Sequence, residues 1–379
     1  MNYIFTETQL MIRDTARQFA EEVLAPTADE RDEKEEFPFE AVKKMGELGF
    51  MGMMVSEQFG GAGLDTISYV LAMEEIAKVD ASACVIMSVN NSLVCWGIET
   101  FGSGEQKEKY LKNLATGAML GAFALSEPEA GSDATNQRTT ARRDGDYFIL
   151  NGTKNFITNG SQADVVLVMA STDRSKGAKG VSAFIVEKNI PGFSVAKKEK
   201  KLGIRSSDTV SLSFQDCRIP AANMIGEEGT GIKLALKTLD GGRIGIATQA
   251  LGIAEASLEA SIKYAKERKA FNHPIAEFQG IQFKLADMAT KIEAARSLVL
   301  NAASLKDRKQ PYATEAAMAK LFASRVAVES ALEAIQIHGG YGYVREYKVE
   351  RFLRDAKITE IYEGTSEIQK VVIARALLK

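Results

Sequence analysis

The sequence predicts an α+β protein in which helical segments flank a β-rich middle. Three observations support this fold class: apolar residues recur at helical spacing over the first third of the 379 residues, short β-branched and aromatic runs fill the middle, and long periodic segments return after Gly229. No helix-length segment lies between the β-rich runs, which favours a sheet or barrel over βαβ units. We expect domains over residues 1–118, 119–228 and 229–379.

The N-terminal domain is expected to be helical. Thr6-Glu7-Thr8-Gln9 has the form of a capping box, and apolar residues follow it at helical spacing up to Pro26. The charged cluster from Asp29 to Glu36 is interpreted as a solvated connector. Further helices are expected near residues 39–48, 66–79, 82–98 and 105–115.

The middle domain is expected to contain strands at four β-rich runs, near residues 147–150, 165–169, 181–186 and 210–214. The basic run from Lys197 to Lys201 lies between two of these runs and is interpreted as a solvated loop. In the C-terminal domain, long helices are expected near residues 230–266, 281–306, 313–338 and 366–378.

Composition argues against several classes of function. The net charge of −3 gives no reason to expect nucleic acid or an anionic membrane as a partner. Cys84, Cys95 and Cys217 form no C-x-x-C pair, so we expect reduced thiols and no metal site. The N-terminus lacks a signal-peptide pattern, and no uninterrupted apolar stretch is long enough to span a bilayer. These features predict a cytoplasmic protein.

Common nucleotide and hydrolase motifs are missing from the sequence. The G-x-G sequences lack the third glycine and the βαβ context of a Rossmann site, and no P-loop, G-x-S-x-G or H-E-x-x-H motif occurs. Only two histidines exist, His273 and His338. If the protein moves protons, a carboxylate is therefore the expected base, and Glu363 is the best-placed candidate because it lies in a Gly-containing break before the last helix.

Two segments at the start and within the β-rich region suit a ligand, although each has a simpler interpretation. The segment 123–133 is either a turn or an anion-binding loop with donors from Ser126 and Ser132. The segment 155–160 is either a strand end before an Asn-Gly turn or an aromatic platform, provided by Phe156, for a flat ring.

Two segments of the C-terminal domain have the same ambiguity. Residues 268–274, with Gln279 downstream, suit a pyrophosphate, but an interhelical salt bridge explains Arg268 equally well. Residues 336–342 end a long helix in glycines, which usually form a cap. His338 is more simply a core or helix-end histidine than a catalyst.

Taken together, these segments resemble those of acyl-CoA dehydrogenases, in the same order and over essentially the whole chain. The matching motifs are L-S-E-P-x-A-G-S-D, F-I-T-N-G, L-D-G-G-R at residues 239–243, R-x-x-F…Q, Q-I-x-G-G-Y-G and I-Y-E-G-T-S-E. The resemblance implies an N-terminal helical domain, a central β-barrel-like domain and a C-terminal four-helix bundle. Residues 88–92 and Glu367 are most similar to short-chain (butyryl-CoA) members.

The resemblance also implies two groups of ligand-binding residues. FAD would lie extended between the β-domain and the C-terminal helices, against Phe123, Ala124, Leu125, Ser126, Glu127, Pro128, Glu129, Ala130, Gly131, Ser132, Phe156, Ile157, Thr158, Arg268, Phe271, Gln279, Gln336, Ile337, His338, Gly339, Gly340, Thr365, Ser366 and Glu367. The acyl-CoA would meet Ser132, Asp240, Gly241, Gly242, Arg243 and Gly364.

The family mechanism assigns Glu363 as the base that removes the α-proton of the thioester, while the β-hydrogen leaves as hydride to the flavin and a trans-2-enoyl-CoA forms. The resemblance implies an electron-transferring flavoprotein as partner, and a composite cofactor site implies a homotetramer. Some family members place the base immediately before the arginine of the L-D-G-G-R motif. That position is Gly242 here, so Glu363 has no rival.

One position departs from the family pattern: Asn272 stands where the family usually has glycine. Asparagine tolerates positive φ better than other non-glycine residues, so the loop is expected to keep its shape. Three alternatives remain open at this point. They are a dehydrogenase for another chain length or a branched substrate, an acyl-CoA oxidase, and a non-catalytic flavin-retaining binding protein.

Overall fold

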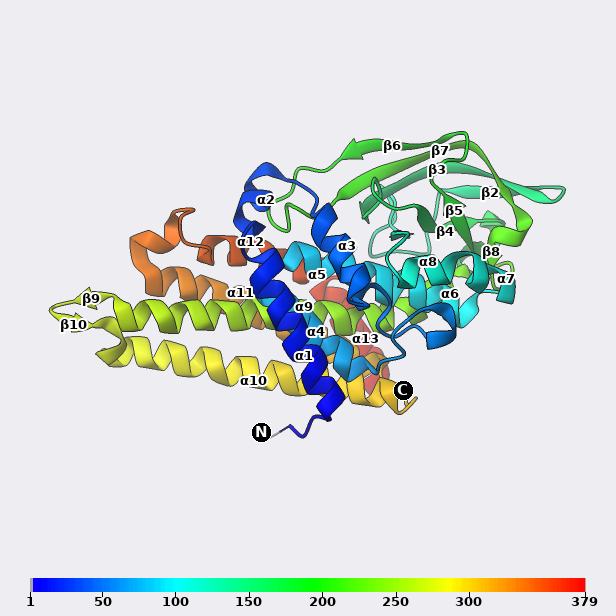
Figure 1. Cartoon of the computed structure of the whole chain (residues 1–379). Coiled ribbons are helices and arrows are strands. Elements are labelled where there is room, and N and C mark those ends of the chain that lie inside the picture. Colours follow the sequence, from blue (N-terminus) through cyan, green and yellow to red (C-terminus); the bar gives the residue numbers. More distant parts are fainter. Residues whose placement is uncertain (1–2, 379) are drawn as a thin grey trace.

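The computed structural model describes residues 3–378, and Figure 1 shows a sheet at one end of a body of long helices. The first helix, α1 (Glu7–Phe19), begins with the predicted capping box. Thr6 Oγ1 accepts a hydrogen bond from the Gln9 amide at 3.2 Å, and Gln9 Oε1 accepts one from the Thr6 amide at 3.0 Å. The cap satisfies amide groups that the first helical turn leaves without partners.

The other predicted N-terminal helices are confirmed. They are α3 (Phe39–Glu47), α4 (Thr66–Val79), α5 (Ala81–Ser88), α6 (Trp96–Phe101), α7 (Gly104–Gln106) and α8 (Lys112–Ala115). Three π-helical segments, Ala20–Leu24, Val89–Cys95 and Lys107–Leu111, join or extend these helices. Helix α4 packs on both α1 and α9 (Gly231–Glu267), so the N-terminal helices lie directly against the C-terminal ones.

One long helical stretch is apolar enough to be compared with a membrane-crossing helix. Ala81–Phe101 has the length and composition of such a helix, and 94% of its most apolar window is buried inside the structure. Burial of this degree is what a core helix of a globular domain shows. The stretch lies between the other N-terminal helices and α9 and contributes Val94 and Ile98 to the main core.

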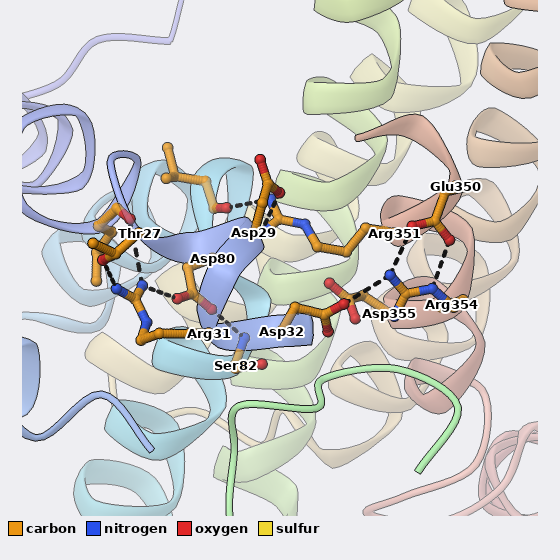
Figure 2. Close-up of polar contacts among 12 residues, drawn as sticks. Thr27, Asp29, Arg31, Asp32, Asp80, Ser82, Glu350, Arg351, Arg354 and Asp355 are labelled. Carbon is orange, nitrogen blue, oxygen red and sulfur yellow. Dashed lines mark hydrogen bonds and ion pairs between the residues drawn. The ribbon is translucent and has the colours of Figure 1, made fainter. Parts of the chain in front are cut away.

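The charged cluster after Pro26 is a helix, and its interpretation as a solvated connector was wrong. Helix α2 (Ala28–Lys34) buries Arg31 and Asp32, which are 9% and 7% exposed. Figure 2 shows their partners: Arg31 donates to Asp80 at 2.7 Å, and Asp32 accepts from Arg354 of α12 (Val349–Thr359) at 2.7 Å. Charged side chains enter the interior when they are paired, as they are here.

The middle of the chain forms one eight-stranded sheet. The four predicted runs are confirmed within β3 (Tyr147–Thr158), β4 (Val165–Ser171), β5 (Val181–Glu187) and β7 (Thr209–Pro220). Four strands were not predicted: β1 (Gly121–Ala124), β2 (Thr140–Asp144), β6 (Phe193–Lys198) and β8 (Met224–Ile225). The order is β6-β7-β3-β2-β4-β5-β8, with β1 paired in parallel to β4.

The alternation of side chains along the strands determines which face of the sheet packs on the helices. In β4, Val165, Leu167 and Met169 join the core shared with the helices, while Val166 and Val168 join a second core on the other face of the sheet. Lys197 and Lys198 belong to the edge strand β6, so the basic run begins in a strand and is not wholly a loop. Lysines on an edge strand discourage pairing with another chain.

The C-terminal part contains the four predicted helices, α9, α10 (Gln279–Asp307), α11 (Ala313–His338) and α13 (Ser366–Leu377), together with α12, which was not predicted. Helix α9 packs against α4, α10, α11 and α12. A small hairpin of β9 (Lys269–Ala270) and β10 (His273–Pro274) joins α9 to α10 at the end far from the large sheet (Figure 1). Short 3₁₀ turns occur at Phe50–Gly52, Glu57–Phe59, Arg174–Gly180, Ala221–Asn223, Ile275–Glu277 and Gly339–Tyr343.

Candidate active site

Glu363 lies in the short loop between α12 and α13. Its φ is +53°, and that of Gly364 is +94°, so two consecutive residues have left-handed backbone conformations. A positive φ is uncommon for glutamate, and such residues gather at functional sites. The loop ends at Thr365, whose side chain accepts a hydrogen bond from the Ile368 amide and caps α13. The backbone therefore directs Glu363 inward before the last helix begins.

The carboxyl group of Glu363 lies against α9 at Gly242. A Cβ atom at Gly242 would clash with Glu363 Oε2 and would come within 2.8 Å of the Leu93 side chain, so only glycine leaves room for this carboxyl. Among residues 3–378, Glu363 Oε2 is a buried oxygen without a hydrogen-bond partner. A buried polar atom of this kind is rare and needs a reason, such as a ligand that faces it.

The surroundings adjust the pKa of Glu363. Burial raises its pKa to about 7, and the cations of Lys320 and Arg243 partly oppose that rise. Arg243 is 4% exposed and donates to Asp240 at 2.7 Å. The structure thus brings together the predicted residues Asp240, Gly242, Arg243 and Glu363. Gly241 lies on the same turn of α9, and Gly364 follows Glu363 in the loop.

The predicted cofactor segment, residues 123–132, begins in strand β1 and continues to the protein surface. Phe123 and Ala124 are buried in β1, Leu125 and Ser126 are half-buried, and Ala130 is buried. Pro128, Glu129, Gly131 and Ser132 are exposed, and a Cβ atom at Gly131 would meet open space. The accessible part of the loop is therefore its tip.

A buried lysine that sequence reasoning missed holds this loop. Lys154 of β3 is 0% exposed, and its amine donates to Glu127 at 2.7 Å, to the Leu125 carbonyl at 3.1 Å and to Gln137 at 2.5 Å. Glu127 was placed among the cofactor contacts, but its carboxylate points into the interior, where it also accepts from the Thr139 amide at 3.1 Å. The signal for such a pair was that Lys154 has the same alternation as the apolar Phe148 and Leu150, which places it on the buried face of the strand.

The end of β3 lies beside the same loop. The Asn155 amide donates to the Ser126 carbonyl at 2.9 Å. Phe156 has a φ of +59° and a side chain that is 66% exposed, Ile157 is buried, and Thr158 is half-buried. The strand ends at Thr158, before Asn159 with its φ of +65°. The predicted strand end is therefore present, and the exposed ring of Phe156 lies two residues before it.

Most of the remaining predicted cofactor residues form a second group at the far end of α9 and α11. A pocket of about 540 Å³ lies there, lined by Tyr264, Arg268, Ile275, Ile337, His338, Gly339, Gly340, Tyr341 and Val344. Phe271 and Gln336 are close in sequence to these lining residues, and both are exposed. Gln279 is the first residue of α10 and is also exposed. Asn272 has a φ of +66°, as expected for a residue in a glycine position.

His338 is a packed helix-end histidine. Its Nδ1 lies 2.7 Å from the Ala334 carbonyl oxygen, its ring stacks on Tyr264 at 4.2 Å, and burial lowers its pKa. Gly339, with a φ of +60°, ends α11. The simpler interpretation of this segment is therefore confirmed for the histidine, while the open space around Gly339 and Gly340 leaves the backbone accessible to a ligand.

The predicted cofactor residues around Arg268 lie far from the residues around Glu363 within one chain. Arg243 and Arg268 are 25 positions apart along α9 and its cap, which corresponds to about 37 Å. Thr365, Ser366 and Glu367 border a different pocket of about 720 Å³ between α10, α11, α12 and α13. Each chain therefore presents a base site, a loop site and a distant arginine pocket.

Family models for the three domains of acyl-CoA dehydrogenases match the chain in order. The N-terminal domain model matches residues 6–118, the middle domain model residues 122–217, and the C-terminal domain model residues 229–378. Together they account for most of the sequence.

Individual relatives are similar over nearly the full length. The mitochondrial short-chain specific acyl-CoA dehydrogenase of Mus musculus is 55% identical, with 98% of this chain and 90% of the mouse protein aligned. The butyryl-CoA dehydrogenase structure from Megasphaera elsdenii is 50% identical with a TM-score of 0.98 and covers 100% of both chains. A chain from the structure of the electron transferring flavoprotein of Acidaminococcus fermentans is 53% identical, with a TM-score of 0.99 and 100% coverage of both chains.

The Lys154–Glu127 pair gives a prediction about stability. In Lys154→Met, the Glu127 carboxylate stays buried without its cation, so we expect the protein to lose about 3–5 kcal/mol of unfolding free energy. Urea unfolding of the purified protein would measure this loss. The control Lys200→Met removes an exposed lysine and should change the free energy by less than about 0.5 kcal/mol. Equal stability of the two variants would contradict the prediction.

Proposed function

The chain belongs to the acyl-CoA dehydrogenase family, and from this premise we propose that it oxidises short-chain acyl-CoA thioesters with Glu363 as the base. It is an FAD-dependent oxidoreductase that acts on the CH–CH bond of an acyl-CoA. The observation that supports the role of Glu363 is its buried carboxyl oxygen, which has no partner in residues 3–378 and lies against Gly242.

The residues present fit FAD. The exposed ring of Phe156 can stack on a flat ring system, Ser126 and Thr158 provide hydroxyl groups, and the space around Gly131 admits a ligand close to the backbone. Arg268, in the pocket beside Gly339 and Gly340, suits a pyrophosphate. When it is bound, FAD supplies the acceptor for the hydride that leaves the β-carbon.

The α-proton of a saturated thioester is too weakly acidic for a carboxylate in water, so the site must help in two ways. First, burial makes Glu363 more basic than an exposed glutamate. Second, hydrogen bonds to the thioester carbonyl must stabilise the developing enolate. The backbone N–H of Glu363 is suited to this, because it donates to no acceptor within residues 3–378. In this arrangement Glu363 would accept the α-proton, and with FAD bound as the acceptor of the β-hydride the product would be a trans-2-enoyl-CoA.

We propose butyryl-CoA as the preferred substrate. The short-chain relatives support this, and so does the packing beside the site. Tyr69, Ser88 and Ser92 are hydrogen-bonded to one another and fill the space next to Gly245, where an added Cβ would lie 2.6 Å from Ser88 Oγ. Gly245 is three positions from Gly242 on α9. Side chains therefore fill the space along α9 one turn from Gly242, and this close packing supports a short acyl chain.

We propose a homotetramer in which one subunit completes the cofactor site of another. The separation of about 37 Å between Arg243 and Arg268 on one chain supports this arrangement. Apolar side chains exposed on the C-terminal helices also support it, because large exposed apolar residues mark interfaces. They include Phe283 of α10, Phe322 and Leu332 of α11, and Val371 and Leu377 of α13.

The similarity to a chain from the electron transferring flavoprotein structure of Acidaminococcus fermentans supports an electron-transferring flavoprotein as the partner that reoxidises this enzyme. We place the enzyme in the cytoplasm, without a membrane or nucleic-acid partner. The three free, buried thiols of Cys84, Cys95 and Cys217 are consistent with a reducing compartment.

A panel of acyl-CoA substrates tests the proposed specificity. Anaerobic mixing of the purified flavoprotein with butyryl-CoA should bleach the flavin faster than mixing with hexanoyl-, octanoyl- or palmitoyl-CoA. Turnover should need a dye or an electron-transferring flavoprotein and should not be supported by oxygen alone. Fastest bleaching by a long or branched acyl-CoA would contradict the short-chain assignment, and turnover with oxygen alone would indicate an oxidase.

The variant Glu363→Gln tests the base. The amide keeps the shape of the side chain but cannot accept a proton, so flavin reduction by butyryl-CoA should slow by at least about 10³-fold. FAD content and acyl-CoA affinity should stay close to those of the parent. The control Glu346→Gln changes an exposed glutamate and should leave the rate unchanged. A normal single-turnover reduction in Glu363→Gln would exclude Glu363 as the base.

The pH dependence follows from the raised pKa. The base must be ionised, so the rate of flavin reduction should rise as the pH increases through about 7 and should level off above it. An exposed glutamate would give a plateau from about pH 5 upwards. Stopped-flow reduction between pH 5.5 and 9 distinguishes these profiles, and a rate that is flat from pH 5.5 would contradict the assignment.

A further inference from the structure

Lys320 is a buried lysine that points at the loop of the base. It lies in α11 among Ala316, Ala317, Ala319 and Ala323, and its side chain is 0% exposed. Its amine donates to the Gly364 carbonyl oxygen at 2.6 Å, which is its hydrogen-bond acceptor within residues 3–378. A fully buried lysine normally has a carboxylate within contact distance. Here no carboxylate of the described residues comes that close, so another reason must retain the charge.

The contact of Lys320 is with the residue directly after Glu363. The Gly364 carbonyl also accepts from Gln369 Nε2 at 2.8 Å, and the same amide group lies 3.3 Å from the Glu363 carbonyl oxygen. Two side chains from different helices, α11 and α13, therefore hold two consecutive carbonyl groups. These are the carbonyls of the two residues with positive φ, so the contacts fix the backbone conformation that directs Glu363 inward.

The charge of Lys320 also acts on the base. Burial raises the pKa of Glu363, and two cations oppose this rise. Of the two, Lys320 has the larger effect and Arg243 the smaller. Arg243 is already neutralised in part by Asp240, whereas Lys320 forms no ion pair with another residue of 3–378. Burial lowers the pKa of Lys320 to about 8, while Glu363 raises it, as do Glu360 of the loop and Glu367 of α13. The amine is thus largely charged at neutral pH.

We propose that Lys320 is a positioning residue for the proposed base: it holds the Gly364 carbonyl and supplies a buried positive charge that favours the ionised form of Glu363. This inference rests on the assignment of Glu363 as the base. A lysine with a merely structural role would satisfy the carbonyl and stabilise the loop, but its loss would lower the reaction rate equally at every pH.

The test compares variants that separate charge from hydrogen bonding. Lys320→Met and Lys320→Gln remove the charge, Lys320→Arg keeps it, and Gln369→Met removes the other donor to the Gly364 carbonyl while leaving the charge in place. Stopped-flow flavin reduction by butyryl-CoA is measured for each flavoprotein from pH 6 to 9.5. FAD content and butyryl-CoA affinity are measured alongside. Arg325→Met, which removes an exposed cation from the same helix, is the control.

In Lys320→Met and Lys320→Gln, the rising limb of the pH profile should move up by about one pH unit, because a nearby cation favours the ionised carboxyl. A shift from 7 to 8 lowers the ionised fraction at pH 7 about fivefold, and most of the rate should return by pH 9. The limb should stay in place in Lys320→Arg, Gln369→Met and Arg325→Met. Tyr69, Tyr362 and Arg243 also act on or lie near Glu363, and Asp240 pairs with Arg243; all four are unchanged in every variant.

An unmoved limb in both neutral variants, with a rate loss that is the same at all pH values, would overturn the inference. If Lys320→Met does not fold, Lys320→Gln decides, because its amide can still donate to the Gly364 carbonyl. The failure of the proposed function looks different. In that case Glu363→Gln would itself reduce flavin normally, whereas an inactive Glu363→Gln with an unmoved limb in the lysine variants would reject only the role of Lys320.

Discussion

The rest of the structure depends on one unfavourable feature, the burial of the Glu363 carboxyl group, whose Oε2 has no hydrogen-bond partner among residues 3–378. An unpaired buried polar group costs free energy, so its position must be imposed by the surrounding fold. The segment before Glu363 is held by α12. Arg354 of that helix is paired with Asp32 and Glu350 (Figure 2). The buried Asp355 of the same helix accepts from the Ile204 amide at 2.5 Å. The segment after it is held by Thr365, Lys320 and Gln369. Glu363, the proposed base, is therefore fixed from both sides.

The ionic cluster of Figure 2 connects all three parts of the chain to this loop. It joins α2 to the start of α5 through Arg31 and Asp80, and α2 to α12 through Asp32 and Arg354. The link to the segment after β6 runs from Asp355 to Ile204, and burial raises the pKa of Asp355 to about 7 despite Arg351 beside it. Buried ion pairs contribute little net stability, but breaking one is costly because a charge is left without a partner. The cluster therefore specifies where α12 sits more than it stabilises the fold.

Local sequence patterns predicted what depends on neighbours in the chain. The capping box at Thr6, the long helices after Gly229 and the four apolar β runs are of this kind, and so are the motifs that contain Gly242 and Glu363. The predictions that were wrong concern residues whose partners lie far away in the sequence. Asp32 finds Arg354 at a separation of 322 positions, and Arg31 finds Asp80 at a separation of 49. The charged sequence of α2, considered without those partners, predicts a solvated connector. Lys154 and Lys320 were missed for the same reason, because only the folded structure shows that their amines face a carboxylate and a carbonyl group.

The length of α9 links the chemistry at the base to the assembly of the protein. Gly242 near its beginning makes room for the carboxyl of Glu363, and Arg268 at its end faces the distant pocket. The helix is continuous from Gly231 to Glu267 and is packed by α4, α10, α11 and α12, so it cannot bend to bring these positions together. A single chain therefore holds Arg243, which acts on Glu363, and Arg268 rigidly about 37 Å apart. The homotetramer that we propose agrees with this rigidity, because a cofactor that contacts both kinds of residue would take them from two chains.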